Sequence, residues 1–367
     1  MAKIDSSFDD LVALMQLQLS ALQYGPGRAD GDDLLRLFNG QLDALDGARG
    51  SKASEILDLL NDQVGALNGA SNSDFDDLID LFGDQLDVLK GSGGPFGQFG
   101  GVDTDDLMDL FGAQLDALDN ASAANVDDLT ELFQNQLGAL DKASPRKAED
   151  LMKLFKNQLD ALSDASPSRI NQMLDLFQKQ LDALNDAPAN RRDDLLDLFS
   201  KQMRALNGAP EEDYDKLIDL FDKQLDALKD ARPGQIDELS DLFKQQLDAL
   251  RGTGETENAG ECEKGEYKEE LMKLIDDQLE TLKDLPRSKR DEAAELFQKQ
   301  LEALKNASPE DREKMIDLFS KQNDALQNAD RADVDKLIEL FAKQIDALAG
   351  DSNDIVELFK DQLELLA

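Results

Sequence analysis

Residues 174–184 read LDLFQKQLDAL, and close variants of this stretch recur along the chain. Aligned on the glutamine before the final LDAL, the motif occurs sixteen times, and eleven of the fifteen intervals have the same length, twenty-two residues. A short unit repeated at one period predicts a repeat protein. The aligned glutamines are Gln18, Gln41, Gln63, Gln85, Gln114, Gln136, Gln158, Gln180, Gln202, Gln224, Gln246, Gln278, Gln300, Gln322, Gln344 and Gln362.

Each repeat has the apolar pattern of one amphipathic helix. With the glutamine as position 0, positions −4 and +4 are Leu in all sixteen copies, and position −3 is Phe in thirteen. At about 100° per residue these positions form one stripe, with acids such as Asp175 and Asp182 on the opposite side. The stripe is predicted to be core. Its phenylalanines include Phe111, Phe133, Phe155, Phe177, Phe199, Phe221, Phe243, Phe297, Phe319 and Phe341.

The ends of the helices are also predicted. Position +6 is Gly, Asn or Asp in most copies, as at Gly208 and Asn328, and these residues tolerate the left-handed backbone that often closes a helix. Ser-Pro pairs such as Ser308-Pro309 are typical of an N-cap and a first turn. We expect helices of about 18 residues, about 27 Å long, joined by about three residues.

The alternative is one continuous helix. The repeat length is twice about eleven residues, and a repeat of about eleven residues gives a continuous helix with a right-handed supercoil. Helix-breaking residues in each repeat argue against it. Short connections favour antiparallel neighbours. The predicted fold class is therefore all-α: single-helix repeats that form antiparallel helical hairpins, stacked as an α-solenoid or an elongated helical array.

Two insertions divide the predicted array. Residues 91–101 form a Gly-rich linker and residues 251–266 a polar, acidic one, both compositions of flexible segments. We expect repeats 1–4 in residues 1–90, repeats 5–11 in residues 102–250 and repeats 12–16 in residues 267–367.

The glutamine is unexpected because it lies inside the apolar stripe. A buried amide without a partner costs about 1–3 kcal/mol, so we expect the glutamines to pair as an amide ladder that fixes the register. Alternating helix directions would place them in two rows, with Gln136 and Gln180 in one and Gln158 and Gln202 in the other. The functional alternative is a row of contacts for an elongated pigment, lipid or peptide. The predicted ladder comprises Gln114, Gln136, Gln158, Gln180, Gln202, Gln224, Gln246, Gln278, Gln300, Gln322 and Gln344.

The composition excludes several functions. The chain has 79 acidic and 39 basic residues and a net charge of −40, which opposes binding to nucleic acids and anionic membranes. It has no His and one Cys, Cys262, so Cys/His zinc sites are not expected. We predict no catalytic residues, no metal site and no cofactor. No signal peptide or membrane span is recognised, so a cytoplasmic protein is expected.

These features predict a non-catalytic scaffold or interaction protein that presents an acidic surface to a protein partner or to copies of itself. Diffuse cation binding is also expected. One alternative is an apolipoprotein-like or phasin-like coat on a lipid surface, because exchangeable apolipoproteins also use Pro-punctuated helical units of this length. The acidic polar face, the absence of Trp and the central glutamine disfavour it. A carrier of an elongated hydrophobic ligand between helix layers is a further alternative.

Overall fold

The computed structural model describes residues 13–18, 31–47, 51–70, 74–93, 104–122, 124–163, 165–188, 190–232, 234–252, 261–331, 333–348, 356 and 359. These residues are helical or lie in short turns, and none of them is in a strand. The bounded helices are α2 (Gly31–Gly47), α3 (Ser51–Gly69), α4 (Asp74–Gly93), α5 (Thr104–Asp119), α6 (Val126–Asp141), α7 (Pro145–Ser163), α8 (Pro167–Asp186), α9 (Arg192–Asn207), the 3-10 turn η1 (Glu211–Asp213), α10 (Tyr214–Lys229), α11 (Ile236–Gly252), α12 (Glu261–Asp284), α13 (Arg290–Asn306), α14 (Pro309–Gln327) and α15 (Val334–Leu348). The predicted all-α repeat array is confirmed.

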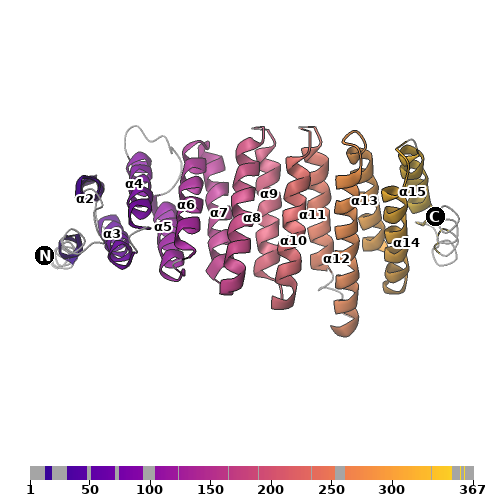
Figure 1. The fold of residues 1–367 in the computed structure, drawn as a ribbon, viewed down its shortest axis with the longest axis horizontal. Coiled ribbons are helices and arrows are strands. Elements are labelled where there is room, and N and C mark those ends of the chain that lie inside the picture. The colour runs from indigo at the N-terminus through magenta and orange to yellow at the C-terminus, as the bar shows by residue number, and fades with distance from the viewer. Residues whose placement is uncertain are drawn as a thin grey trace. The chain divides into compact units, whose positions relative to one another are not determined.

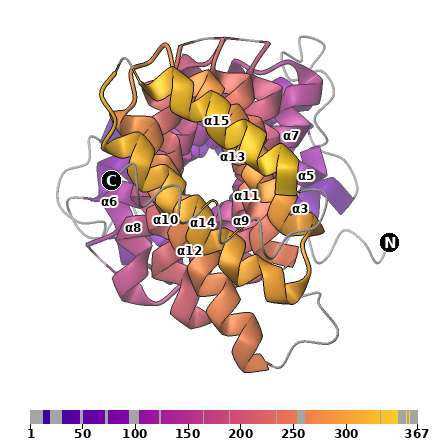
Figure 2. The same ribbon diagram turned by 90° about the vertical axis from the view of Figure 1, so that its right-hand side faces the viewer.

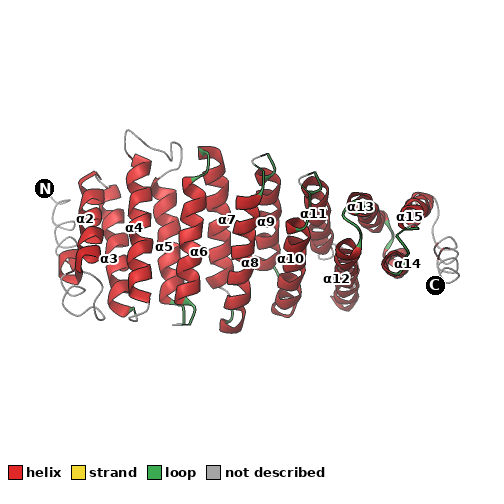
Figure 3. Cartoon of the chain, turned by 45° about the horizontal axis from the view of Figure 1, so that its top comes forward, coloured by secondary structure: helices red, strands yellow, loops and turns green. Residues whose placement is uncertain are grey.

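The chain divides into two compact units, Met1–Asn185 and Asp186–Ala367. Within each unit a helix packs most extensively on the helix two places along, as α2 does on α4 and α12 on α14, and less extensively on the next one. Consecutive helices run in opposite directions (Figure 1 and Figure 3). Alternate helices therefore lie side by side in one layer and consecutive helices in opposite layers, as α12 and α14 do relative to α13 in Figure 2. This is the two-layer arrangement of an α-solenoid.

The core of each unit is the apolar stripe. Position −4 is 5 % exposed or less in every helix from α2 to α14, and the predicted core phenylalanines are all fully buried. Buried helical side chains at this spacing lie on one face of each helix and pack between the two layers. No helix in the described part of the chain is long and apolar enough to span a membrane.

The helix C-termini differ from the prediction. The cap residues Gly208 and Asn328 have φ of −100° and −87°, so the predicted left-handed closure is wrong at both. A tight turn closes the helices, in which the N–H of position +7 donates to the carbonyl of position +4, as from Ala209 to Leu206. The Asn328 side chain also donates to the carbonyl of Asp324. Position +6 thus needs no positive φ at these two sites, and asparagine there adds a side-chain donor.

Arginine at position −10 caps the preceding helix. Arg192 Nε donates to the carbonyl of Ala187, Arg290 Nε to that of Leu285 and Arg312 Nε to that of Leu304. The last turn of a helix has unpaired carbonyls that attract cations. The sequence analysis did not predict these arginine-to-carbonyl hydrogen bonds, although the three arginines occupy the same position of the repeat.

The N-terminal prediction is confirmed at Ser308, whose Oγ accepts a hydrogen bond from the Asp311 N–H while Pro309 occupies the first turn. Helices α7 and α8 likewise begin at the prolines of Ser-Pro pairs. Connections are short there, whereas several helices without such a pair follow longer connections, such as residues 285–289 between α12 and α13.

The predicted linkers are partly helical. Helix α4 extends to Gly93, and α12 begins at Glu261, so residues 91–93 and 261–266 belong to helices. Residues 94–101 and 253–260 lie outside the described residues. The boundary between the compact units, at Asn185, falls inside the predicted middle group of repeats.

Candidate functional site: the amide ladder and the acidic face

The glutamines of unit 1 hydrogen bond to one another in sequence order. Each Nε2 donates to the Oε1 of the next glutamine, at distances from 2.8 to 3.3 Å. The line contains Gln18, Gln41, Gln63, Gln85, Gln114, Gln136, Gln158 and Gln180. From Gln41 onward these side chains are fully buried.

Unit 2 has a second line of the same kind. Its Nε2-to-Oε1 distances lie between 2.8 and 3.2 Å, and the direction of donation again follows the sequence. Its members are Gln202, Gln224, Gln246, Gln278, Gln300, Gln322 and Gln344.

The expected separation into two rows is wrong, because Gln136 donates to Gln158 on the next helix and not to Gln180. The prediction assumed that the glutamines of antiparallel neighbours lie too far apart along the helix axes. In α6 (Val126–Asp141), Gln136 is only two to three residues past the middle of the helix, and the long side chains span the remaining offset. Each interior amide thus has a glutamine on both sides.

Outside the core, the array carries rows of exposed carboxylates. Positions −5 and +2 are mostly acidic and exposed, and seven residues correspond to nearly two turns, so both lie on one face of the helix. In the described residues position −5 includes Asp58, Asp80, Asp109, Glu131, Asp175, Asp197, Asp219, Asp241, Glu295, Asp317 and Glu339. Position +2 includes Asp87, Asp116, Asp160, Asp182, Asp226, Asp248, Glu280, Glu302, Asp324 and Asp346.

In unit 2 lysines beside the ladder neutralise part of this face. At position −1, Lys201 Nζ lies 3.6 Å from Asp248 and Lys299 Nζ lies 3.3 Å from Asp346. Each pair joins position −1 of one helix to position +2 of the helix two places along. These contacts tie neighbours in one layer together, although each exposed pair contributes only about 0.2–1 kcal/mol.

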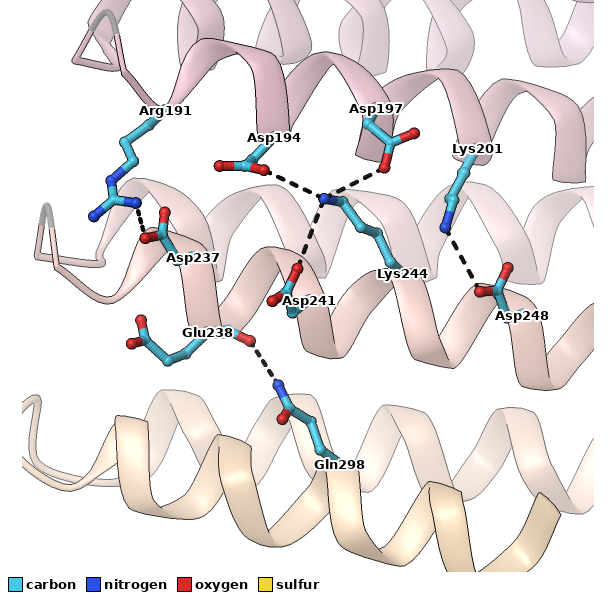
Figure 4. A network of polar contacts seen from close by, with 10 residues as sticks. All are labelled: Arg191, Asp194, Asp197, Lys201, Asp237, Glu238, Asp241, Lys244, Asp248 and Gln298. Carbon is cyan, nitrogen blue, oxygen red and sulfur yellow. Dashed lines mark hydrogen bonds and ion pairs between the residues drawn. The ribbon is translucent and has the colours of Figure 1, made fainter. Parts of the chain in front are cut away.

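Lys244 forms the densest ion-pair cluster in the described part of unit 2 (Figure 4). Its Nζ lies 3.3 Å from Asp197, 3.7 Å from Asp194 and 3.7 Å from Asp241. The lysine side chain is only 13 % exposed. Arg191 pairs with Asp237 at the same joint between α9 and α11. The cluster fixes the register of two helices in one layer.

Unit 1 has less of this neutralisation between α3 and α6, although Lys156 of α7 lies 3.5 Å from both Asp106 and Asp109 of α5. Residues 53–141 contain 19 acidic residues and a single basic one, Lys90. Burial together with Asp58, Asp116 and Asp119 raises the pKa of Asp62, and burial together with Asp80 and Asp87 raises that of Asp84. Both occupy position −1, where several later repeats have Lys. We call the surface formed by Asp58 and Asp62 of α3 and by Asp116 and Asp119 of α5 the uncompensated face.

Two cavities lie in equivalent grooves of unit 2. One of about 470 Å³ is lined by Ala249 of α11, Tyr267 of α12, Leu301 of α13 and Arg312 of α14. The other, of about 300 Å³, is lined by Ala227 of α10 and Leu279 of α12. The small alanine at position +3 leaves space between helices two places apart. Both grooves mix acidic and basic side chains, and Arg312 is already engaged by the Tyr267 ring at 5.5 Å.

No model of a known protein family matches the chain, and no curated protein sequence is similar to it at a significant level. The described residues contain no group of three or more Cys, Asp or Glu side chains placed to hold a metal ion. The class that fold and surface define is therefore a helical repeat protein with an acidic face.

Proposed function

We propose that this chain is a non-catalytic scaffold that binds a basic polypeptide partner on its uncompensated face. The main support is the contrast between equivalent positions of the repeat. Lys201 and Lys299 sit against carboxylates of neighbouring helices, whereas Asp62 sits against further carboxylates. Lysine and arginine side chains of a partner would supply the missing charge.

The arrangement suits an extended partner. Carboxylates recur at the same positions of alternate helices, so α3 and α5, which lie side by side in one layer, present a row of acceptors to a lysine-rich segment. Such a row speeds association and selects partners by charge. Burial of the apolar stripe and pairing of the glutamines leave this polar surface as the part of the helices that a partner can contact.

The test is the binding of a fluorescent lysine-rich peptide to the full chain, measured by anisotropy over a series of salt concentrations. One variant neutralises the α3–α5 cluster through Asp58→Asn, Asp62→Asn and Asp116→Asn. Its matched control removes three exposed charges in unit 2 through Asp226→Asn, Glu295→Gln and Glu302→Gln.

We expect the α3–α5 variant to bind about tenfold more weakly, since three exposed charge contacts contribute about 0.5 kcal/mol each. The control should change affinity less than about twofold. Equal losses in the two variants would mean that the peptide responds only to net charge, and the proposed face would be wrong.

A further inference from the structure

One polar contact recurs where the first turns of helices two places apart meet. It joins position −11 of one repeat to position −9 of the repeat two places along. At three joints of unit 2, a carboxylate at position −9 faces a cation or an amide donor at position −11. The pairs are Arg191 with Asp237, Gln235 with Asp291 at 2.7 Å, and Lys289 with Asp335 at 2.6 Å. Each of these joints therefore combines one donor with one acceptor.

The joint between α4 and α6 in unit 1 has carboxyl groups at both positions. Asp74 occupies position −11 of its repeat and Asp127 position −9, and the two side chains are hydrogen bonded to each other. Asp74 is only 5 % exposed. Ionised carboxylates are acceptors only, so this hydrogen bond exists only while one of the two groups carries a proton. Desolvation, followed by the charges of Asp74 and Asp77, raises the pKa of Asp127.

A second joint with two acidic residues is neutralised by lysines. Between α10 and α12, Asp213 occupies position −11 and Glu269 position −9. Lys268 Nζ lies 2.6 Å from Asp213, and Lys216 Nζ lies 2.9 Å from Glu269. Each carboxylate of this joint thus has a cation of its own.

The helices around the α4–α6 joint place no comparable cation beside it in the described part of unit 1. The positions of the two lysines hold Val126 and Asp77. Helices α5 and α6 contain no basic residue, and Lys90 lies at the opposite end of α4. In α2, Arg36 pairs with a carboxylate of its own helix at 3.0 Å. Because consecutive helices run in opposite directions, α3, α5 and α7 end beside the joint, and their last turns hold no basic residue. The carboxylates of these last turns are Asp116, Asp119 and Asp160.

We propose that the contact between Asp74 and Asp127 is a pH-sensitive joint, which holds the first turns of α4 and α6 together while the pair keeps one proton. In the protonated pair, the Asp127 hydroxyl donates to the Asp74 carboxylate. When the proton passes to solvent, both groups are ionised and repel each other, and Asp77 and Asp128 add to the repulsion.

The direction of the pH response follows from where the proton is held. The closed joint keeps a proton that an open joint releases, because the pKa of Asp127 is raised only when Asp74 is beside it. Closure is therefore strongest below the usual aspartate pKa near 4 and weakens as the pH rises through the raised value. The joints of unit 2 that have Arg, Gln or Lys at position −11 do not share this response, because those side chains do not lose a proton there.

The test is backbone amide hydrogen exchange of the full chain, measured by nuclear magnetic resonance at several pH values. The reporter is the Leu129 N–H, which donates to the Asn125 carbonyl at 3.0 Å in the first turn of α6. Its matched reporter in unit 2 is the Leu239 N–H, which donates to the Gln235 carbonyl at 3.1 Å. Protection factors are compared, since the exchange of an open amide itself changes with pH.

Three variants separate the pair from its surroundings. Asp74→Asn keeps a hydrogen-bond donor that cannot ionise, and Asp74→Lys reproduces the pair of Lys289 and Asp335. Asp76→Asn is the matched control, because it removes an exposed charge from the same turn of α4 and leaves the pair intact.

In the unmodified chain and in Asp76→Asn, we expect the protection of Leu129 to fall as the pH rises toward neutral, by up to about tenfold per pH unit. In Asp74→Asn and Asp74→Lys it should respond to pH no more than the protection of Leu239 does. The proposal is wrong if Leu129 and Leu239 respond alike in the unmodified chain. It is also wrong if Asp74→Asn keeps the full pH response of Leu129.

Discussion

Asn323 occupies position +1 of α14, where the other described repeats have Leu, Ile, Val or Met. Its side chain is fully buried, and neither its Oδ1 nor its Nδ2 has a hydrogen-bond partner. We expect Asn323→Leu to raise the free energy of unfolding by about 1–3 kcal/mol, the penalty of a buried unpaired amide. Urea denaturation measures it. Leu301→Asn, at the same position of α13, should lower stability, and a lower stability of Asn323→Leu would contradict this account of the residue.

Asp62 allows a test of how the charge of a single side chain affects stability. In Asp62→Lys the new amine would meet Asp58 and Asp116, the carboxylates that raise the pKa of Asp62, as Lys201 meets Asp248 in unit 2. Stability should rise by about 0.5 kcal/mol and the gain should shrink at high salt. The urea midpoint at low and high salt measures both. A gain that salt leaves unchanged would show that the effect is not electrostatic.

The sequence predicted the identity of the buried residues well, because the repeated pattern averages over many copies. The burial of the glutamines and the need to pair them followed from the position of Gln136 inside an apolar stripe. Their partners did not follow, since whether Gln136 reaches Gln158 or Gln180 depends on how far the helices are shifted along their axes. The ion pairs of Lys244 required the same spatial information.

At the scale of the helix, the ends were the least predictable part. Glycine or asparagine at position +6 indicates that a helix ends, but it is compatible with both a left-handed and a right-handed backbone at that residue. In the structure φ is negative at Gly208 and Asn328. The tight turn and the side-chain donors satisfy the last carbonyls without a positive φ. The arginine caps act between helices, so propensities within a single helix do not reveal them.

Glycines inside helices make α4 and α5 less stable than they need to be. Gly83 and Gly112 both occupy position −2, and a Cβ at either site meets nothing within 4 Å. We expect Gly83→Ala and Gly112→Ala each to raise stability by about 0.5–1 kcal/mol, because alanine restricts the unfolded chain. Thermal or urea denaturation checks this. At Gly208 a Cβ would lie 3.4 Å from the Arg204 carbonyl, so Gly208→Ala should gain less, and equal gains would contradict this reasoning.

At the scale of the whole chain, the surplus of carboxylates sets the response to pH. Burial, followed by neighbouring carboxylates, raises the pKa of Asp62 and Asp84, and burial is also the largest cause of the raised pKa of Asp277. A raised pKa in the folded state means that the folded chain holds protons that the unfolded chain releases. Stability from these groups is full below their unfolded pKa and is lost as pH rises through the folded value.

We therefore expect the urea midpoint to increase as the pH falls from neutral toward the raised pKa values of these groups, which lie above the usual carboxylate range near 4. Hydrogen bonds and ion pairs with Lys153 and Lys343 lower the pKa of Glu149 and Glu339. The stability that these two glutamates contribute is therefore lost only at still lower pH. The same titration at high salt should be flatter, since screening weakens repulsion between exposed carboxylates. A midpoint that falls steadily from neutral to weakly acidic pH would contradict the charge balance described above.

The central claim is that each compact unit is held in register by one buried line of glutamine amides. Hydrogen exchange of the glutamine side-chain amides, followed by nuclear magnetic resonance on the chain labelled at glutamine, measures it directly. We predict a slowly exchanging group that includes Gln136, Gln158, Gln224 and Gln300, whereas the partly exposed Gln134 and Gln178 exchange quickly. Rapid exchange of all glutamine amides under folding conditions would contradict the ladder.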